Sequence, residues 1–307
     1  MKKTIYVPDI ECDSCSKLIS KKLSEEQGIN NFSMTEESVD VDFDEQKTNT
    51  QNIIKIISDS GFRASEEPFE RKTLKERMRD FKENKKKYEV EKKILRYTVA
   101  LFFALLIIEA IVYFVVLKNI PDFIQKYALW IIYLDVSVSV IALGMWHIFS
   151  YRAKVTCMVG MMIGMTIGMQ TGMMIGAILG ATNGFFTGAM VGMLLAVIVG
   201  SIAGKCCGVM GVMEGMMAGV MGGTMGPMIS VMMFSDNLNI FMPVYLIINI
   251  IITWGLSYML YEEVVENKKG VIKKPIDFMT LTAYTTIITL IILAIMLYGP
   301  KSGLASF

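Results

Sequence analysis

The chain has 307 residues, of which 53% are hydrophobic, and its 30 Lys and Arg residues nearly balance its 29 Asp and Glu residues. Several apolar runs exceed the roughly 18 residues that a membrane-spanning helix requires, which excludes an ordinary soluble protein. The net charge of +1 gives no support to a nucleic-acid-binding function. We therefore expect an integral membrane protein. Its partner is the lipid bilayer, and we expect no nucleic-acid partner.

The first 66 residues combine short strand patterns with two amphipathic helix patterns. Strands are predicted at 4–7, 29–34, 38–43 and from Phe62, and helices at 14–26 and 50–60. The order is βαββαβ, which predicts an α+β, ferredoxin-like sandwich over residues 1–66.

A C-x-x-C motif, Cys12 and Cys15, lies in the loop between the first strand and the first helix. Amide groups and the dipole at a helix N-terminus favour thiolates there, and a thiolate pair binds a soft cation. A redox-active pair of the thioredoxin type is the alternative, but it calls for a longer fold. Glu11 is either a third, harder ligand that shifts the preference towards Zn(II) or another divalent ion, or a solvated loop acid.

These residues, together with the hairpin and the Gly61-Phe62 pair, resemble the heavy-metal-associated domain family. The resemblance covers only the N-terminal part of the chain. It implies that two thiolates bind a transition-metal ion and pass it on by ligand exchange, for which a cytosolic metallochaperone is a possible partner. The sequence departs from the family at Ile10, commonly Met, and at Glu11, commonly Thr. We expect Ile10 to lie in the core.

Residues 67–96 are densely charged, with Leu74, Met78 and Phe81 at helical spacing. We expect a juxtamembrane helix that is continuous with the first span. Its excess of Lys and Arg places the N-terminus in the cytosol by the positive-inside rule.

Residues 97–307 are predicted to form an all-α membrane domain with seven spans. We place these at 97–117, 128–149, 155–181, 184–203, 207–232, 241–261 and 276–298. Lys and Arg gather in the loops that this count places inside, which predicts a C-terminus outside the plasma membrane. The fourth span has an alternative as a re-entrant pair.

A glycine-rich stretch at 159–233 repeats glycine every fourth residue over most of its length. Small residues at this spacing let helices approach closely in a bilayer, so we expect glycine-zipper packing and a homo-oligomer. Methionines repeat at the same spacing in two columns: Met161, Met165, Met169 and Met173, then Met213, Met217, Met221 and Met225. The columns are either two ladders of soft ligands that lead an ion across the bilayer, or gap-filling and lipid-facing side chains.

Three more cysteines, Cys157, Cys206 and Cys207, are predicted at the cytosolic ends of the third and fifth spans. They are candidate ligands that exchange a metal ion with Cys12 and Cys15, or small buried hydrophobic residues. Vicinal cysteines at a span are similar to those of bacterial mercuric-ion transporters. The methionine and glycine spacing is similar to that of eukaryotic copper transporters, which have three spans per subunit and no such N-terminal domain.

Ionisable residues within spans are candidate functional groups. Glu109 and Asp135 lie at similar depth and would share a proton or bind a cation. Glu214 in the fifth span is a further candidate, or a protonated acid bonded to a neighbouring helix. His147, beside Trp146, is expected at the membrane interface rather than in a metal site.

The sequence has neither a nucleotide-binding loop nor a phosphorylation segment, so a metal-pumping ATPase is excluded and no enzyme is predicted. We expect a transporter of a soft transition-metal ion, with Cu(I) favoured. The alternatives are a membrane-anchored metallochaperone or sensor, and an oligomeric glycine-zipper channel regulated by metal. Loss of transport in a Met169→Leu, Met217→Leu variant would favour the transporter over the anchored chaperone.

Overall fold

The computed structural model describes residues 2–8, 10, 13–35, 38–60, 62–68, 89–115, 118, 123–151, 155, 157–262, 264 and 277–303. The chain divides into two compact units, residues 1–87 and 88–307, and each is described by itself. Residues 69–88, most of the predicted juxtamembrane helix, lie outside the described part. Residues 89–96 of that segment belong to the first membrane helix, which begins at Glu89.

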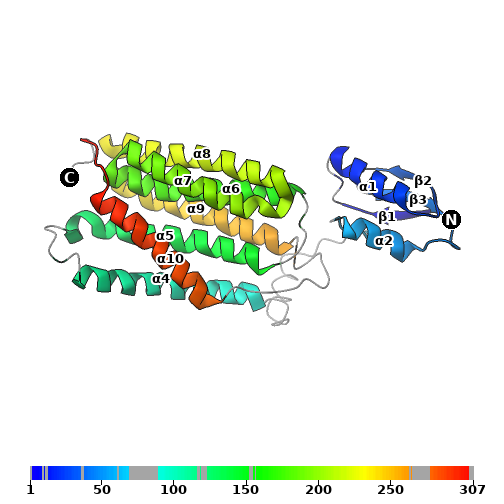
Figure 1. The fold of residues 1–307 in the computed structure, drawn as a ribbon, viewed down its shortest axis with the longest axis horizontal. Coiled ribbons are helices and arrows are strands. Elements are labelled where there is room, and N and C mark those ends of the chain that lie inside the picture. The colour runs from blue at the N-terminus through cyan, green and yellow to red at the C-terminus, as the bar shows by residue number, and fades with distance from the viewer. Residues whose placement is uncertain are drawn as a thin grey trace. The chain divides into compact units, whose positions relative to one another are not determined.

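The N-terminal unit is a small antiparallel sheet with two helices (Figure 1). Its elements are β1 (Lys2–Tyr6), α1 (Asp13–Glu25), β2 (Ile29–Met34), β3 (Ser38–Phe43) and α2 (Thr50–Asp59). The strand order is β1-β3-β2, and Ser65 forms an isolated bridge with Tyr6 of β1. The strand predicted from Phe62 is thus a single bridge within the described residues, at the position beside β1 that the ferredoxin-like topology gives it.

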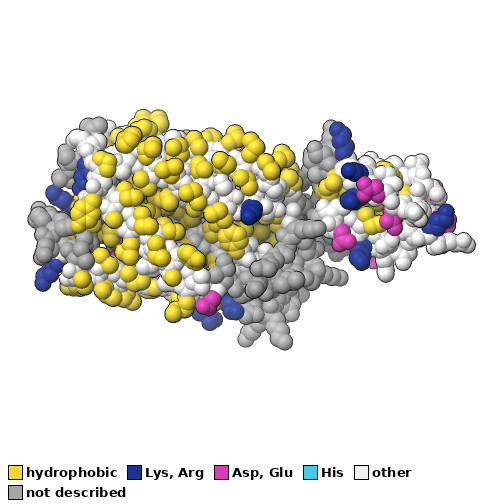
Figure 2. Space-filling view, in the orientation of Figure 1, with side chains coloured by type: hydrophobic (Ala, Val, Ile, Leu, Met, Phe, Trp, Pro, Cys, Tyr) yellow, Lys and Arg dark blue, Asp and Glu magenta, His cyan; other side chains and the backbone are white. Residues whose placement is uncertain are grey.

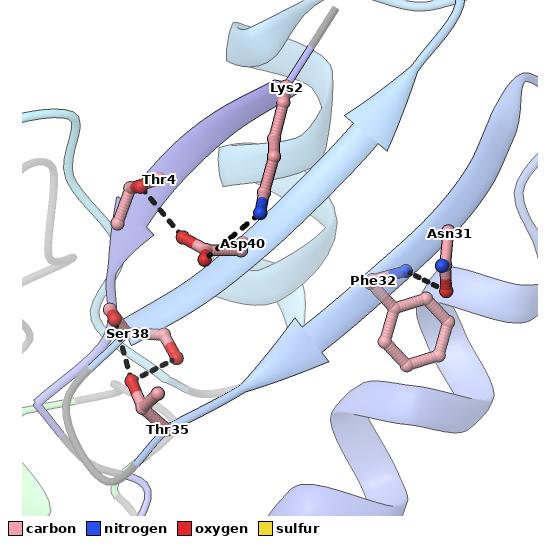
Figure 3. A network of polar contacts seen from close by, with 7 residues as sticks. All are labelled: Lys2, Thr4, Asn31, Phe32, Thr35, Ser38 and Asp40. Carbon is pink, nitrogen blue, oxygen red and sulfur yellow. Dashed lines mark hydrogen bonds and ion pairs between the residues drawn. The ribbon is translucent and has the colours of Figure 1, made fainter.

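Alternation along β3 separates a buried face from a polar one. Val39, Val41 and Phe43 are buried in the core of this unit. Asp40 lies on the other face, where it accepts a hydrogen bond of 2.7 Å from Thr4 Oγ1 and lies 3.8 Å from Lys2 Nζ (Figure 3). Successive residues of a strand point to opposite faces of the sheet. The pairing of β3 with β1 that buries Val39, Val41 and Phe43 therefore also places Asp40 beside Lys2 and Thr4 on the polar face.

The second unit has seven helices of 20 to 28 residues in its described part. They are α4 (Glu89–Val115), α5 (Phe123–Ser150), α6 (Cys157–Asn183), α7 (Phe185–Gly204), α8 (Gly208–Met232), α9 (Leu238–Tyr261) and α10 (Phe278–Tyr298). Six described segments are long and apolar enough to cross a membrane, one being the 51-residue stretch Phe185–Ser235 that contains both α7 and α8. The chain is an integral membrane protein by this measure, and hydrophobic side chains cover the helical part in Figure 2.

Glycines line the contacts among α6, α7 and α8. A Cβ atom on Gly164 of α6 would lie 2.9 Å from the Gly204 Cα atom of α7 and 2.7 Å from the Gly211 carbonyl oxygen of α8. A Cβ atom on Gly188 would lie 2.8 Å from the Cα atom of Gly180. These pairs show that α7 runs antiparallel to α6 with backbone against backbone, the contact that small residues permit in membrane helices.

Two glycines with positive φ make the reversals at the ends of α7. Gly184 has φ of 102° between α6 and α7, and Gly208 has φ of 70° after the 3₁₀ turn η2 (Lys205–Cys207). Side chains with a Cβ rarely adopt this conformation, so glycine permits both tight turns. Between them α7 is one continuous helix of 20 residues, which at about 1.5 Å per residue matches the roughly 30 Å apolar core of a bilayer.

The other helices surround α6. Helices α5 and α9 pack against α6, and α4 and α10 pack against α5. In the most apolar 18-residue segment of α6, 72% of the residues are buried, whereas in the corresponding segment of α4 only 17% are buried. Tyr97 of α4 contacts the Trp146 ring of α5 and the Phe278 ring of α10. The N-terminal parts of α4 and α10 and the C-terminal part of α5 therefore lie at the same end of the bundle.

Candidate metal-binding site

The C-x-x-C motif precedes and enters the first helix of the N-terminal unit. Cys15 is the third residue of α1, as expected for a thiol at a helix N-terminus, while Glu11 and Cys12 lie outside the described residues. Ile10 is only 7% exposed and belongs to the core, which confirms the expectation for this position.

The membrane cysteines meet at one end of the glycine-packed helices. Cys157 is the first residue of α6, and Cys206 and Cys207 lie in η2 between α7 and α8. The Cys207 Sγ atom lies 2.7 Å from the Cys157 Sγ atom and 3.1 Å from the Cys157 carbonyl oxygen. The Cys206 thiol has a different hydrogen-bond partner, the Ala203 carbonyl oxygen at 3.6 Å. The structure therefore brings two of the three predicted thiols into contact, and we call this the thiol end.

Gly160 leaves the space that these thiols occupy. A Cβ atom there would lie 3.4 Å from the Sγ atoms of both Cys206 and Cys207, and it would also meet the Cys207 Cβ atom. A larger residue one turn after Cys157 would push η2 away from α6. The pair thus depends on the same close helix approach that glycine provides along the rest of α6.

The donor set at the thiol end suits a soft ion with few ligands. Cys157 is exposed and Cys207 is half-buried, so both thiols are accessible. Among the described residues, no group of three or more His, Cys, Asp or Glu side chains is placed to hold a metal ion. A structural Zn(II) site takes four such ligands, whereas thiolates select soft ions such as Cu(I). Two thiolates therefore fit a soft ion better than Zn(II).

Comparison with known proteins identifies the N-terminal unit. The sequence profile of the heavy-metal-associated domain matches residues 4–63. The mercuric transport protein periplasmic component of Pseudomonas aeruginosa is 33% identical over 64 residues, which are 20% of this chain and 70% of that protein. The chain belongs to the heavy-metal-associated domain family. Its HMA domain carries the C-x-x-C motif, and no solved structure matches the chain.

The methionine columns of this HMA-domain protein are not placed alike. On α8, Met213, Met217, Met221 and Met225 are 41 to 59% exposed. On α6, Met165 is exposed, while Met161, Met169 and Met173 are partly buried. The α8 column thus points away from the packed interior, an arrangement that the alternative of lipid-facing methionines describes. The glycines of α8 occupy the inner side instead, because only they allow backbone contact with α6 and α7.

Buried carboxyl groups lie in another part of the bundle. Glu109 of α4 is 7% exposed and Asp135 of α5 is fully buried, and the two carboxyl groups interact with each other. The sequence did not single out Ser139, which is 2% exposed and lies one turn from Asp135 on α5. Helical spacing from Asp135 would have found it. Glu214 on α8 is half-buried and lies apart from both the carboxyl pair and the thiol end.

His147 differs from its predicted place at the membrane interface. It is only 2% exposed, and its ring lies 5.5 Å from the Tyr151 ring, centroid to centroid. Trp146 beside it is fully buried. Trp146 packs against Tyr97 of α4 and lies in one buried cluster with Ile163 of α6 and Leu256 of α9, so this turn faces protein rather than lipid headgroups.

Proposed function

We propose that this protein carries a soft, thiol-binding metal ion across the membrane, and that the HMA domain exchanges the ion with Cys157 and Cys207. The observation that carries the proposal is the contact between these two thiols. They lie 50 residues apart in sequence, and yet their Sγ atoms are 2.7 Å apart at the thiol end. A second two-thiol site in the membrane domain matches the two-thiol motif of the HMA domain, which suits transfer by ligand exchange.

The connection between the domains supports this exchange. The segment after the HMA domain leads into α4, whose Val90 lies in the same buried cluster as Ile163 of α6 and Ala203 of α7. These residues are close in sequence to Cys157 and Cys206, so α4 begins at the thiol end. A domain tethered there has a high effective concentration near the membrane thiols. We place this end and the HMA domain in the cytosol because the predicted positive loops lie there.

The metal-ligating side chains favour two soft ions as candidates. The preference for Cu(I) depended on methionine ladders, and the α8 column is exposed on the outer surface of its helix. Thiolates remain as the main donors, and they fit Hg(II) as well as Cu(I). The name of the mercuric transport relative adds weight to Hg(II). We therefore propose a carrier, not an enzyme, for a soft d¹⁰ ion, with Hg(II) and Cu(I) as the ions to compare.

Metal content of the purified full-length protein tests the membrane site. After anaerobic loading with Hg(II) or Cu(I), we expect the Cys12→Ser, Cys15→Ser variant to retain metal. Adding Cys157→Ser and Cys207→Ser should remove it. Adding Cys206→Ser should not, because the Cys206 thiol bonds to the Ala203 carbonyl oxygen, whereas the Cys207 thiol contacts the Cys157 thiol. Complete loss of metal from the first variant would contradict the membrane site.

Flux into proteoliposomes then separates a carrier from an anchored chaperone. We expect Cys157→Ser with Cys207→Ser to abolish uptake of the preferred ion, and Cys206→Ser to leave it near the wild-type rate. Uptake that persists without Cys157 and Cys207 would overturn the proposed route. Metal binding without any uptake by the wild-type protein would overturn the carrier itself.

A further inference from the structure

The structure encloses two carboxyl groups between α4 and α5 with no opposite charge beside them. Glu109 is 7% exposed and Asp135 is fully buried. Among the described residues, no other group forms a hydrogen bond with any of their four carboxyl oxygens. The two carboxyl groups interact with each other. Unpaired charges at such a depth are very costly, so this arrangement requires an explanation.

The register of the two helices sets both groups at one depth. Helices α4 and α5 are antiparallel: Tyr97 contacts Trp146 at the thiol end, and Tyr113 stacks on Phe123 at the other end. At about 1.5 Å per residue, Glu109 lies roughly 18 Å from the Tyr97 level and Asp135 roughly 17 Å from the Trp146 level. Both carboxyl groups are therefore deep within the apolar part of the bundle.

A third polar side chain points into the same region. The Ser139 Oγ atom is buried and has no hydrogen-bond partner in the described part of the chain. Ser139 lies one helical turn from Asp135, on the same face of α5. It is an independent sign that the region holds something polar, because buried hydroxyl groups are almost always bonded.

The helices packed around the pair offer no compensating cation. Helix α10 contributes Thr285 and Thr289, whose hydroxyl groups bond to their own helix, and its titratable residues are exposed tyrosines. Helices α6 and α9 have no Lys, Arg, Asp or Glu residue. On α4 and α5 the other titratable residues are Glu89, Glu91, Lys92, Lys93, Arg96, Tyr97, Tyr113, Lys126, Tyr127, Tyr133 and His147. The charged ones among these lie towards the two helix ends, and the tyrosines are neutral at pH 7.

We propose that Glu109, Asp135 and Ser139 form a proton-binding site inside the membrane, in which the two carboxyl groups share at least one proton. Two adjacent buried carboxylates cannot both ionise, and a shared proton replaces one negative charge by a hydrogen bond. Ser139 supplies a further donor or acceptor to the pair. The site is separate from the thiol end. Its existence does not rest on the proposed metal transport, although it would give that transport an ion to couple to.

Infrared spectroscopy of the purified full-length protein tests this site without any metal. At neutral pH we expect the carbonyl stretching band of a protonated carboxylic acid, shifted in heavy water. The band should vanish in the Glu109→Gln, Asp135→Asn variant and persist in Glu214→Gln, a matched change at a half-buried acid. Absence of the band from the wild type, or its survival in the double variant, would overturn the proposal. Loss of the band on adding Na⁺ or Mg²⁺ would assign the site to a metal cation and overturn it equally.

The pH dependence of stability gives a second readout that does not require the double variant to be active. The folded protein holds a proton that the unfolded chain releases at neutral pH, so the folded state binds more protons and stability falls as pH rises. We expect the melting temperature of the wild type to fall between neutral and mildly alkaline pH. It should change much less in the double variant. Equal slopes in the two proteins would contradict a shared proton.

Discussion

Individual glycines decide how closely the central helices pack. A Cβ atom on Gly164 would lie 2.7 Å from the Gly211 carbonyl oxygen, which is backbone and cannot turn aside, whereas Gly255 has nothing within 4 Å. We expect Gly164→Ala to destabilise the protein by about 1–3 kcal/mol through overpacking. Gly255→Ala should be neutral or stabilising by up to about 1 kcal/mol from helix propensity. Thermal unfolding in detergent measures both, and equal shifts would contradict backbone packing at Gly164.

The sequence predicts the glycine and methionine columns but not which of them faces inward. Both repeat every fourth residue, so their periodicity is the same. Helix packing determines which column faces inward. Helices α6, α7 and α8 touch through backbone atoms and leave no room between them for the long side chains of Met217 and Met221. The contact between Cys157 and Cys207 likewise follows from how α6, α7 and α8 fold together, although the sequence placed both thiols at one end.

At the scale of elements, the turn between α6 and α7 holds the end of α10. The Asn183 amide donates to the carbonyl oxygens of Ile295 at 3.1 Å and Gly299 at 3.4 Å, and Asn183 is 1% exposed. We expect Asn183→Ala to cost about 1–3 kcal/mol, because a buried polar contact is lost. Asn237→Ala is the matched control, since Asn237 is an exposed N-cap without a side-chain cap bond. Equal melting temperatures for the two variants would show that this contact does not hold α10.

Most elements were predictable because their patterns are local. All seven predicted spans correspond to helices, and the expected continuity of the juxtamembrane helix with the first span is confirmed from Glu89 onward. The predicted last strand of the HMA domain is longer than the single bridge that Ser65 forms with Tyr6 among the described residues. Whether residues pair there depends on the neighbouring edge strand β1, which the local sequence pattern does not show. The buried place of His147 also depends on neighbouring helices, which local sequence does not specify.

At the scale of the molecule, consecutive helices alternate in direction. Helices α4 and α10 begin at the thiol end, where Tyr97 contacts Phe278, and α7 returns to it because Gly204 lies against Gly164. At the opposite end, Asn183, the last residue of α6, donates a hydrogen bond to the last turn of α10. Helices α7 and α8 lie side by side and run in opposite directions within the 51-residue apolar stretch, so we predict that this stretch crosses the membrane twice. Seven crossings would place the two ends of the membrane domain on opposite sides.

This arrangement predicts a reporter pattern in cells. We expect a reporter fused at the N-terminus, and one inserted between α9 and α10, to lie in the cytosol, and a reporter at the C-terminus to lie outside. If α7 and α8 shared one crossing, the α9–α10 reporter would be outside and the C-terminal one inside. Protease protection in spheroplasts and inverted vesicles distinguishes the two patterns. A fully reversed pattern would keep seven crossings but place the thiol end outside. It would contradict the orientation derived from the positive-inside rule, and with it a cytosolic HMA domain that loads Cys157 and Cys207.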